Sequence, residues 1–262
     1  MTDKEYRDHE GISRSQLWPL LSQTPLHFKY NLEHPESKDS KVMAFGRAAH
    51  KYILEKELFN LDFAVAPNCD RRTKAGKEQY ETFLSLAEGK EVISEDDYKV
   101  ILEMAAAIDE DPFARQFLTG LCEEPYFWTD KETGEPLKVR PDCIATYEGK
   151  KYIVDYKTTD SCADGHFESS VRRFGYKFQS GMYREGVFQN TFDDYKFAFV
   201  AQEKKAPYAC RVYICDEDFL IEGYEQFRKA INLYHWCKVN ECWYGYEGSE
   251  TLLSELVGEG EI

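Results

Sequence analysis

The chain has 262 residues, of which 42% are hydrophobic and 15% aromatic, so it can build a sizeable folded core. Its formal net charge of −15 argues against a protein whose whole surface binds nucleic acid, because phosphate contacts need lysine and arginine. No apolar run reaches the roughly 18 to 20 residues of a membrane span, and the polar N-terminus lacks the apolar core of a secretory signal. We therefore expect no membrane association and a cytoplasmic protein.

The first part of the chain is predicted to be mainly helical. A helix over residues 13–34 would begin at Ser13 or Ser15, with Pro19 tolerated near its first turn. Ser94 precedes three acidic residues and is expected to cap a later helix. The further elements expected here are a helix over residues 40–59, a strand over 63–67, a basic loop and helix ending at Gly89, and a helix over 95–118.

The second part changes to the alternating pattern of strands. Between residues 123 and 159, the turn signals ETGE and YEGKK predict three antiparallel strands joined by hairpins. A helix over residues 169–188, strands over 195–203 and 208–216, and a helix over 217–240 are expected to follow. This order favours a mixed α/β (α+β) fold, with a helical N-terminal part and a central sheet, in one domain over residues 1–262.

Eight cysteines are present, but none forms a C-x-x-C pair, so a zinc ribbon or thioredoxin-like motif is not indicated. We expect reduced, mostly buried thiols, as in a reducing compartment. An iron–sulfur cluster held by cysteines is the alternative.

The stretch RPDCIATYEGKKYIVDYKTT carries the chemistry. Asp155 and Lys157 lie two residues apart on a predicted strand, so their side chains face the same way. The hairpin would return Asp155 to the side of Asp142, which follows Pro141. Two carboxylates and a backbone carbonyl suit Mg²⁺ or Mn²⁺, and a neighbouring lysine can orient water and stabilise a phosphoryl group. A polar hairpin with an exposed Asp–Lys pair fits the spacing as well.

Other polar residues add to this pattern. Glu123 or Glu124 lies just upstream, and His50 on the second predicted helix could be a further ligand. Gln179 and Tyr183 lie at i and i+4 on one helix face. Taken singly, His50 also fits a partly buried histidine on a helix flank, and the Gln–Tyr pair fits an ordinary helix surface.

Together these residues resemble a known pattern. Asp142 followed by Asp155-x-Lys157 resembles the core of the PD-(D/E)xK nuclease superfamily, and His50 and Gln179-x-x-x-Tyr183 resemble extra motifs of its branch of recombination and phage exonucleases. The blocks GISRSQLWPLLSQTPLHF, FGRAAHKYILE, FAVAPNCDRRTKAGKE, RPDCI with DYKTT, and FGYKFQSGMY look like those of exonuclease VIII-type recombination nucleases, in the same order.

The resemblance implies a restriction-endonuclease-like core and a Mg²⁺-dependent exonuclease, with Mn²⁺ as a possible substitute. Such an enzyme digests one strand of double-stranded DNA from its 5′ end in phage-type recombination. It implies that Asp142 and Asp155 hold metal, with Glu123, favoured over Glu124, and His50 completing the shell. Lys157 would position the attacking water.

The same resemblance implies that Gln179 and Tyr183 steady the site or the substrate. A DNA contact is expected at the basic run of Arg71, Arg72, Lys74 and Lys77, for which a solvated loop is the alternative. The cysteines of the iron–sulfur branch have no counterpart, so no iron–sulfur cluster is expected.

Expected partners are double-stranded DNA ends, a single-strand annealing protein and further copies of the chain in a ring-shaped homo-oligomer such as a tetramer. Three alternatives stay open at this point. They are an endonuclease on the same core, a non-catalytic DNA-binding or assembly protein, and a structural or small-molecule-binding α+β domain.

Overall fold

The computed structural model describes residues 1, 3–34 and 41–246. Its helices are α1 (Asp3–Asp8), α2 (Arg14–Leu17), α3 (Pro19–Ser22), α4 (Pro25–Glu33), α5 (Lys41–Leu54), α6 (Phe59–Asp62), α7 (Lys74–Leu86), α8 (Glu95–Glu110), α9 (Pro112–Phe117), α10 (Asp164–Phe174), α11 (Tyr176–Thr191) and α12 (Glu217–Val239), with a 3-10 turn, η1 (Lys56–Leu58). The strands are β1 (Ile12–Ser13), β2 (Phe63–Val65), β3 (Glu91–Ile93), β4 (Gly120–Cys122), β5 (Tyr126–Thr129), β6 (Pro136–Val139), β7 (Cys143–Tyr147), β8 (Lys150–Thr159), β9 (Lys196–Glu203) and β10 (Cys210–Ile214). Within this part of the chain, no helix is both long and apolar enough to cross a membrane.

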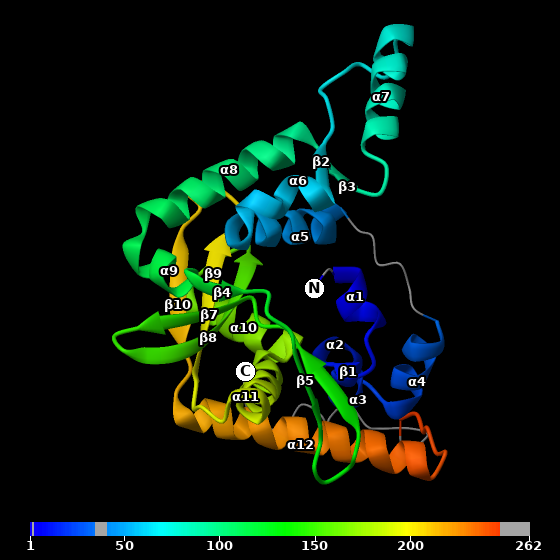
Figure 1. Cartoon of the computed structure of the whole chain (residues 1–262), viewed down its shortest axis with the longest axis vertical. Coiled ribbons are helices and arrows are strands. Elements are labelled where there is room, and N and C mark those ends of the chain that lie inside the picture. The colour runs from blue at the N-terminus through cyan, green and yellow to red at the C-terminus, as the bar shows by residue number, and fades with distance from the viewer. Residues whose placement is uncertain (2, 35–40, 247–262) are drawn as a thin grey trace, which may run out of the picture.

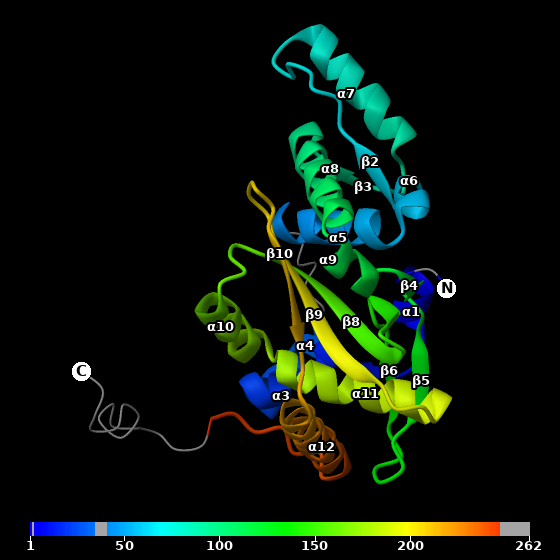
Figure 2. The same cartoon turned by 90° about the vertical axis from the view of Figure 1, so that its left-hand side faces the viewer.

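A five-stranded sheet in the order β10-β9-β8-β7-β4 forms the centre of the fold (Figures 1 and 2). Strands β8 and β9 run parallel, and the other neighbours run antiparallel. Alternate residues of β8 enter different cores: Val154 packs in the cluster with Met104 and Phe117, and Ile153 in the cluster with Phe167. The sheet therefore has helices on both faces, and the predicted mixed α/β fold with a flanked central sheet is confirmed.

Several predicted elements appear within a few residues of their expected bounds. The helix expected over residues 40–59 is α5, although Ser40 lies outside the described residues. Strands β2, β9 and β10 and helices α7 and α12 are also found. Ser94 caps α8, as predicted, by accepting the N–H of Asp97 at 3.0 Å.

The single helix expected over residues 13–34 is wrong. Three short helices replace it, and α3 and α4 each begin at a proline, Pro19 and Pro25. Proline lacks the N–H that a helix interior needs, so each one starts a new helix instead of continuing the last. Of the two candidate caps, Ser13 is the one used: its N–H donates to Gln16 Oε1 at 2.8 Å.

Two other long helices are also divided. The one expected over residues 95–118 breaks at Asp111, which caps α9 by accepting the N–H groups of Phe113 and Ala114, both at 3.0 Å. The one expected over residues 169–188 breaks at Gly175, which has a left-handed backbone with φ of 65° and separates α10 from α11. Glycine adopts this conformation without a steric penalty, so it can turn the chain sharply between the two helices.

The three predicted antiparallel strands are four, in two different sheets. The middle one is interrupted between β6 and β7, where Pro141 has no N–H to give to a strand ladder. As a result, β5 and β6 pair with β1 in a separate sheet, while β7 and β8 join the central one. The interruption places Asp142 in the loop between β6 and β7, directly before the first residue of β7.

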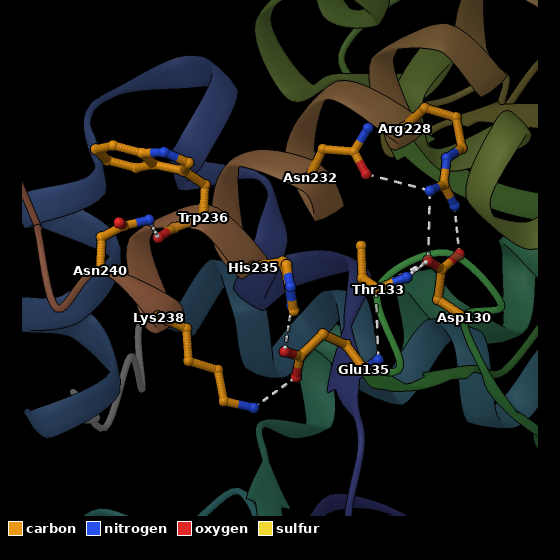
Figure 3. Close-up of polar contacts among 9 residues, drawn as sticks. All are labelled: Asp130, Thr133, Glu135, Arg228, Asn232, His235, Trp236, Lys238 and Asn240. Atoms are coloured by element: carbon orange, nitrogen blue, oxygen red, sulfur yellow. Dashed lines mark hydrogen bonds and ion pairs between the residues drawn. The ribbon is translucent and has the colours of Figure 1, made fainter.

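The turn between β5 and β6 is anchored to α12 by two buried acids (Figure 3). Asp130 accepts hydrogen bonds from Arg228, and Glu135 accepts one from Lys238 Nζ at 2.6 Å and lies 3.0 Å from His235 Nδ1. Both carboxylates are 4% exposed. Arg228 and Asp130 are both largely buried, and removing one partner of such a pair typically costs about 3 to 5 kcal/mol. The anchor therefore fixes the hairpin whose last strand leads to Asp142.

Helices α11 and α12 cross at a pair of glycines, and this contact gives a stability prediction. A Cβ on Gly181 would lie 2.2 Å from the carbonyl carbon of Gly223. Gly181→Ala should therefore lower the free energy of unfolding by about 1 to 3 kcal/mol or more in chemical denaturation. The matched control is Gly165→Ala in α10, where the added Cβ meets open space and should change stability by at most about 1 kcal/mol. Equal stability of the two variants would contradict the close crossing.

Candidate metal centre

The seven residues expected to form the site line one cavity of about 890 Å³. They come from α5, the loops around β4 and β7, strand β8 and helix α11. They are His50, Glu123, Asp142, Asp155, Lys157, Gln179 and Tyr183. The fold thus brings together residues that lie up to 133 positions apart, from His50 to Tyr183.

Asp155 and Lys157 face the same side of β8, as strand alternation requires. The Lys157 ammonium forms an ion pair with Asp155 Oδ2, and the Gln179 side-chain amide donates to Asp155 Oδ1. Asp155 is 2% exposed, and its Oδ2 has no hydrogen-bond donor beside it other than that ammonium. This carboxylate is therefore held on both oxygens and fixed in orientation.

Asp142 lies at the centre of the constellation. Its Oδ2 accepts the backbone N–H of Tyr156 at 2.7 Å and lies 3.5 Å from His50 Nδ1. The bond to Tyr156 holds the Asp142 carboxylate against β8, beside Asp155. The interruption at Pro141, which divides the predicted strand into β6 and β7, thus also positions Asp142.

Glu123 completes a group of three possible metal ligands. One ligand atom each of His50, Glu123 and Asp142 can be chosen so that all lie within 4.8 Å of one another. The Glu123 backbone is left-handed, with φ of 54°, and its N–H donates to the Asp142 carbonyl at 3.2 Å. Its neighbour Glu124 does not line the cavity. Two carboxylates and an imidazole fit a divalent cation such as Mg²⁺ or Mn²⁺.

Burial and neighbouring charges shift the pKa values of the residues in the site. Burial raises the pKa of Asp142 well above its usual value, and the negative charges of Asp155 and Glu123 raise it further. Burial, and then the charge of Lys157, lowers the pKa of His50 to about 4, so the imidazole is neutral at physiological pH, the form that binds metals. For Lys157, burial lowers the pKa, but Asp155 and Asp142 outweigh it, so the net pKa is raised and the ammonium stays charged.

Gln179 and Tyr183 both face the cavity from α11, but only Gln179 touches a carboxylate. Burial raises the pKa of Tyr183 well above its usual value, and Asp155 adds to the effect. The tyrosine therefore keeps its proton and can donate a hydrogen bond to an anionic group in the cavity.

The contact between Gln179 and Asp155 gives a second prediction. In Gln179→Leu the amide is lost, and Asp155 Oδ1 loses its donor. Partners that orient metal ligands are typically worth about 10- to 100-fold in metal affinity or activity. We expect a loss of that size in divalent-cation affinity, measured by titration calorimetry. Gln189→Leu on the same helix, which removes only a bond to Glu185, should bind the cation like the wild type.

The predicted basic run lies outside this cavity. Arg71, Arg72, Lys74 and Lys77 belong to α7 and the loop before it, and none of them lines the cavity. Figures 1 and 2 show α7 projecting from the end of the molecule opposite α12. Arg71 stacks on Tyr80, and Arg72 pairs with Asp70. The DNA-contact role of this run stays a prediction.

Besides Lys157, six basic residues that the sequence analysis does not name as site residues surround the site. Seven lysines and arginines line the cavity together with six acidic residues, so the local charge is near neutral in a chain of net charge −15. Arg14 of α2 is partly buried: its guanidinium donates to the Gly175 carbonyl at 3.0 Å, while its Nε is buried without a hydrogen-bond partner. Its position inside the block GISRSQ was the one available signal. The basic lining residues are Arg7, Arg14, Arg47, Lys51, Lys138, Arg140 and Lys157.

Comparisons with known proteins agree with this geometry. A crystal structure from Eubacterium rectale, described as a "putative exonuclease", has a TM-score of 0.66 at 16% sequence identity, covering 99% of this chain and 98% of that one. This similarity shows the fold. A second structure, SSO0001, has 17% identity over 88% of this chain and 81% of that one, with a TM-score of only 0.37. No curated protein matches the chain.

The family comparison is decisive for the superfamily. Residues 13–253 match the model of a family described as a PDDEXK-like domain of unknown function (DUF3799). The matched range contains the whole candidate site, from His50 to Tyr183. The chain therefore belongs to this PDDEXK-like family, a nuclease-type domain of the PD-(D/E)xK superfamily.

Proposed function

We propose that this protein is a Mg²⁺-dependent exodeoxyribonuclease that degrades one strand of linear double-stranded DNA from its 5′ end. One observation carries the proposal: His50, Glu123 and Asp142 form a ligand group beside the Asp155–Lys157 pair in a single cavity. Membership of the PDDEXK-like family supports nuclease chemistry. The description of the Eubacterium rectale protein supports the choice of an exonuclease.

The residues of the chain suggest how hydrolysis would proceed. A divalent cation, when held by His50, Glu123 and Asp142 with Asp155 as the further expected ligand, supplies Lewis acidity and offsets the charge of the phosphate. Lys157, charged and held by Asp155, orients the attacking water and stabilises the negative charge that grows on the phosphoryl oxygens. The water oxygen bonds to phosphorus as the bond to the leaving oxygen breaks on the opposite side.

The remaining polar groups hold the substrate and the catalytic groups. Gln179 keeps Asp155 in place, and the protonated Tyr183 donates to a phosphate oxygen. Arg14 offers a cation for a second phosphate at the wall of the same cavity. We extend the proposal to DNA ends as substrate, to a ring-shaped homo-oligomer and to action beside a single-strand annealing protein.

The test is a time course with linear duplex DNA labelled at either the 5′ or the 3′ end, in Mg²⁺, in Mn²⁺ and in chelator. We expect early release of the 5′ label as small products, later release of the 3′ label, and no reaction in chelator. A covalently closed circle should stay intact. Nicking of the circle would favour an endonuclease on the same core, and the absence of any cleavage with either metal would refute the proposal.

A further inference from the structure

Two cysteines face each other across the sheet edge next to the candidate metal ligands. Cys122 on β4 is the register partner of Cys143 on β7. In the following pair, the Glu123 N–H donates to the Asp142 carbonyl at 3.2 Å. Hydrogen-bonded and non-hydrogen-bonded pairs alternate in an antiparallel ladder, so the cysteines occupy a non-hydrogen-bonded pair, with Cα atoms roughly 4.5 Å apart. That spacing falls within the range found for disulfides, about 4.4 to 6.8 Å.

The side chains as well as the backbones are suitably placed. Both cysteines are free thiols, and Cys122 packs against the core cluster that contains Cys143. Cys143 is fully buried, whereas Cys122 is partly exposed. Cys122 is therefore the thiol that a reagent from solution can reach, and Cys143 is shielded from the solvent.

The pair is directly linked to the metal site through the chain. Cys122 precedes Glu123, and Cys143 follows Asp142. The two cysteines lie in or against the core cluster with Met104 and Phe117, while the two carboxylates line the cavity. A change in the distance between the sulfurs is thus transmitted over one residue to both carboxylates.

We propose that Cys122 and Cys143 are a reversible disulfide site, and that closing the disulfide weakens cation binding at His50, Glu123 and Asp142. A disulfide shortens the sulfur–sulfur distance to about 2.05 Å, well below that of two thiols in contact. Strand β4 has three residues and lies at the sheet edge, so β4 is the strand that moves when the disulfide closes. Metal ligands need distances correct to about 0.2 Å, and Glu123 is the ligand that moves.

The oxidant is a low-molecular-weight disulfide, and the exchange balances in two steps. The Cys122 sulfur attacks one sulfur of the reagent, the reagent disulfide breaks, and one thiol leaves with the Cys122 proton. The Cys143 sulfur then attacks Cys122 Sγ, the mixed disulfide breaks, and the second thiol leaves with the Cys143 proton. Two electrons pass from the protein to the reagent, and a dithiol reductant reverses both steps.

The experiment treats the reduced full-length protein with oxidised glutathione and follows it by intact mass, peptide mapping and Mn²⁺ titration calorimetry. We expect a Cys122–Cys143 disulfide, with a loss of two hydrogen masses in the linked peptides, and Mn²⁺ binding at least about 10-fold weaker, restored by dithiothreitol. Cys143→Ser should trap a glutathione adduct on Cys122, whereas Cys122→Ser should leave Cys143 unmodified. The matched control Cys242→Ser, at an exposed thiol outside the cavity, should behave like the wild type.

Two outcomes would overturn the inference. One is the absence of the Cys122–Cys143 disulfide from the peptide map, and the other is a mapped disulfide with unchanged Mn²⁺ affinity. The effect on the cation rests on the proposed metal site, but the disulfide does not. If the reduced protein binds no Mn²⁺, both the proposed function and the coupling are refuted. The peptide map would still show whether the Cys122–Cys143 disulfide forms.

Discussion

Asp142→Asn should lower the rate of Mg²⁺-dependent DNA hydrolysis by about 10³-fold. The substitution keeps the shape of the side chain and an oxygen that can accept the Tyr156 N–H, but it removes the negative charge at the centre of the ligand group. Metal-derived stabilisation of the transition state is worth several kcal/mol, and about 4 kcal/mol corresponds to that factor. Initial rates on linear duplex DNA measure it, and thermal melting shows that the fold is retained.

The matched control is Asp193→Asn, which removes an exposed carboxylate whose ion pair with Lys151 lies away from the cavity. It should cleave DNA at the wild-type rate. The pH dependence gives a second check. Because the pKa of Asp142 is raised, protons compete for this carboxylate at higher pH than for a free aspartate, and cation affinity should fall on acidification. That dependence should be weaker in Asp142→Asn. A variant as active as the wild type would mean that the site is wrongly assigned.

The parts of the site that the sequence could predict are those set by local geometry. The period of a strand is enough to place Asp155 and Lys157 on one side, and their ion pair is found in the structure. The hairpin turn is enough to return β8 beside β7. His50 and Glu123 are different, because nothing local connects α5 to the loop after β4. The residue types alone indicate them as possible ligands, and the family resemblance favours Glu123 over Glu124 and implies that both complete the shell.

The interrupted helices and strand and the basic lining of the cavity could not be predicted from apolar periodicity and net charge. Pro19, Pro141 and Gly175 each interrupt an element that apolar periodicity predicts to be continuous. The charge of the cavity was not visible at all. Its basic lining is assembled from separate segments, such as Arg14 from α2 and Arg140 after β6, which only the tertiary fold brings together. A net charge of −15 therefore says little about the site.

Lys157→Gln should separate the role of the lysine from that of the metal ligands. We expect kcat to fall by about 10²- to 10³-fold, the usual cost of removing one group that stabilises transition-state charge. The affinity for the divalent cation should stay the same or increase, because the variant removes a positive charge that opposes the cation beside Asp142. Asp142→Asn should have the opposite effect and lower the affinity for the divalent cation. Calorimetry with Mn²⁺ and single-turnover cleavage of duplex DNA measure the two effects separately.

The control for Lys157 is Lys204→Gln, which removes a partly buried ammonium paired with Asp160 outside the cavity. It should leave both cation affinity and cleavage unchanged, even if it costs some stability. Lys157→Arg keeps a positive charge beside Asp155 but changes its shape, so it should recover part of the loss if charge is what matters. If Lys157→Gln instead loses the cation and Lys157→Arg restores it, the lysine acts by holding Asp155 for the metal, and the direct role on the phosphoryl group is wrong.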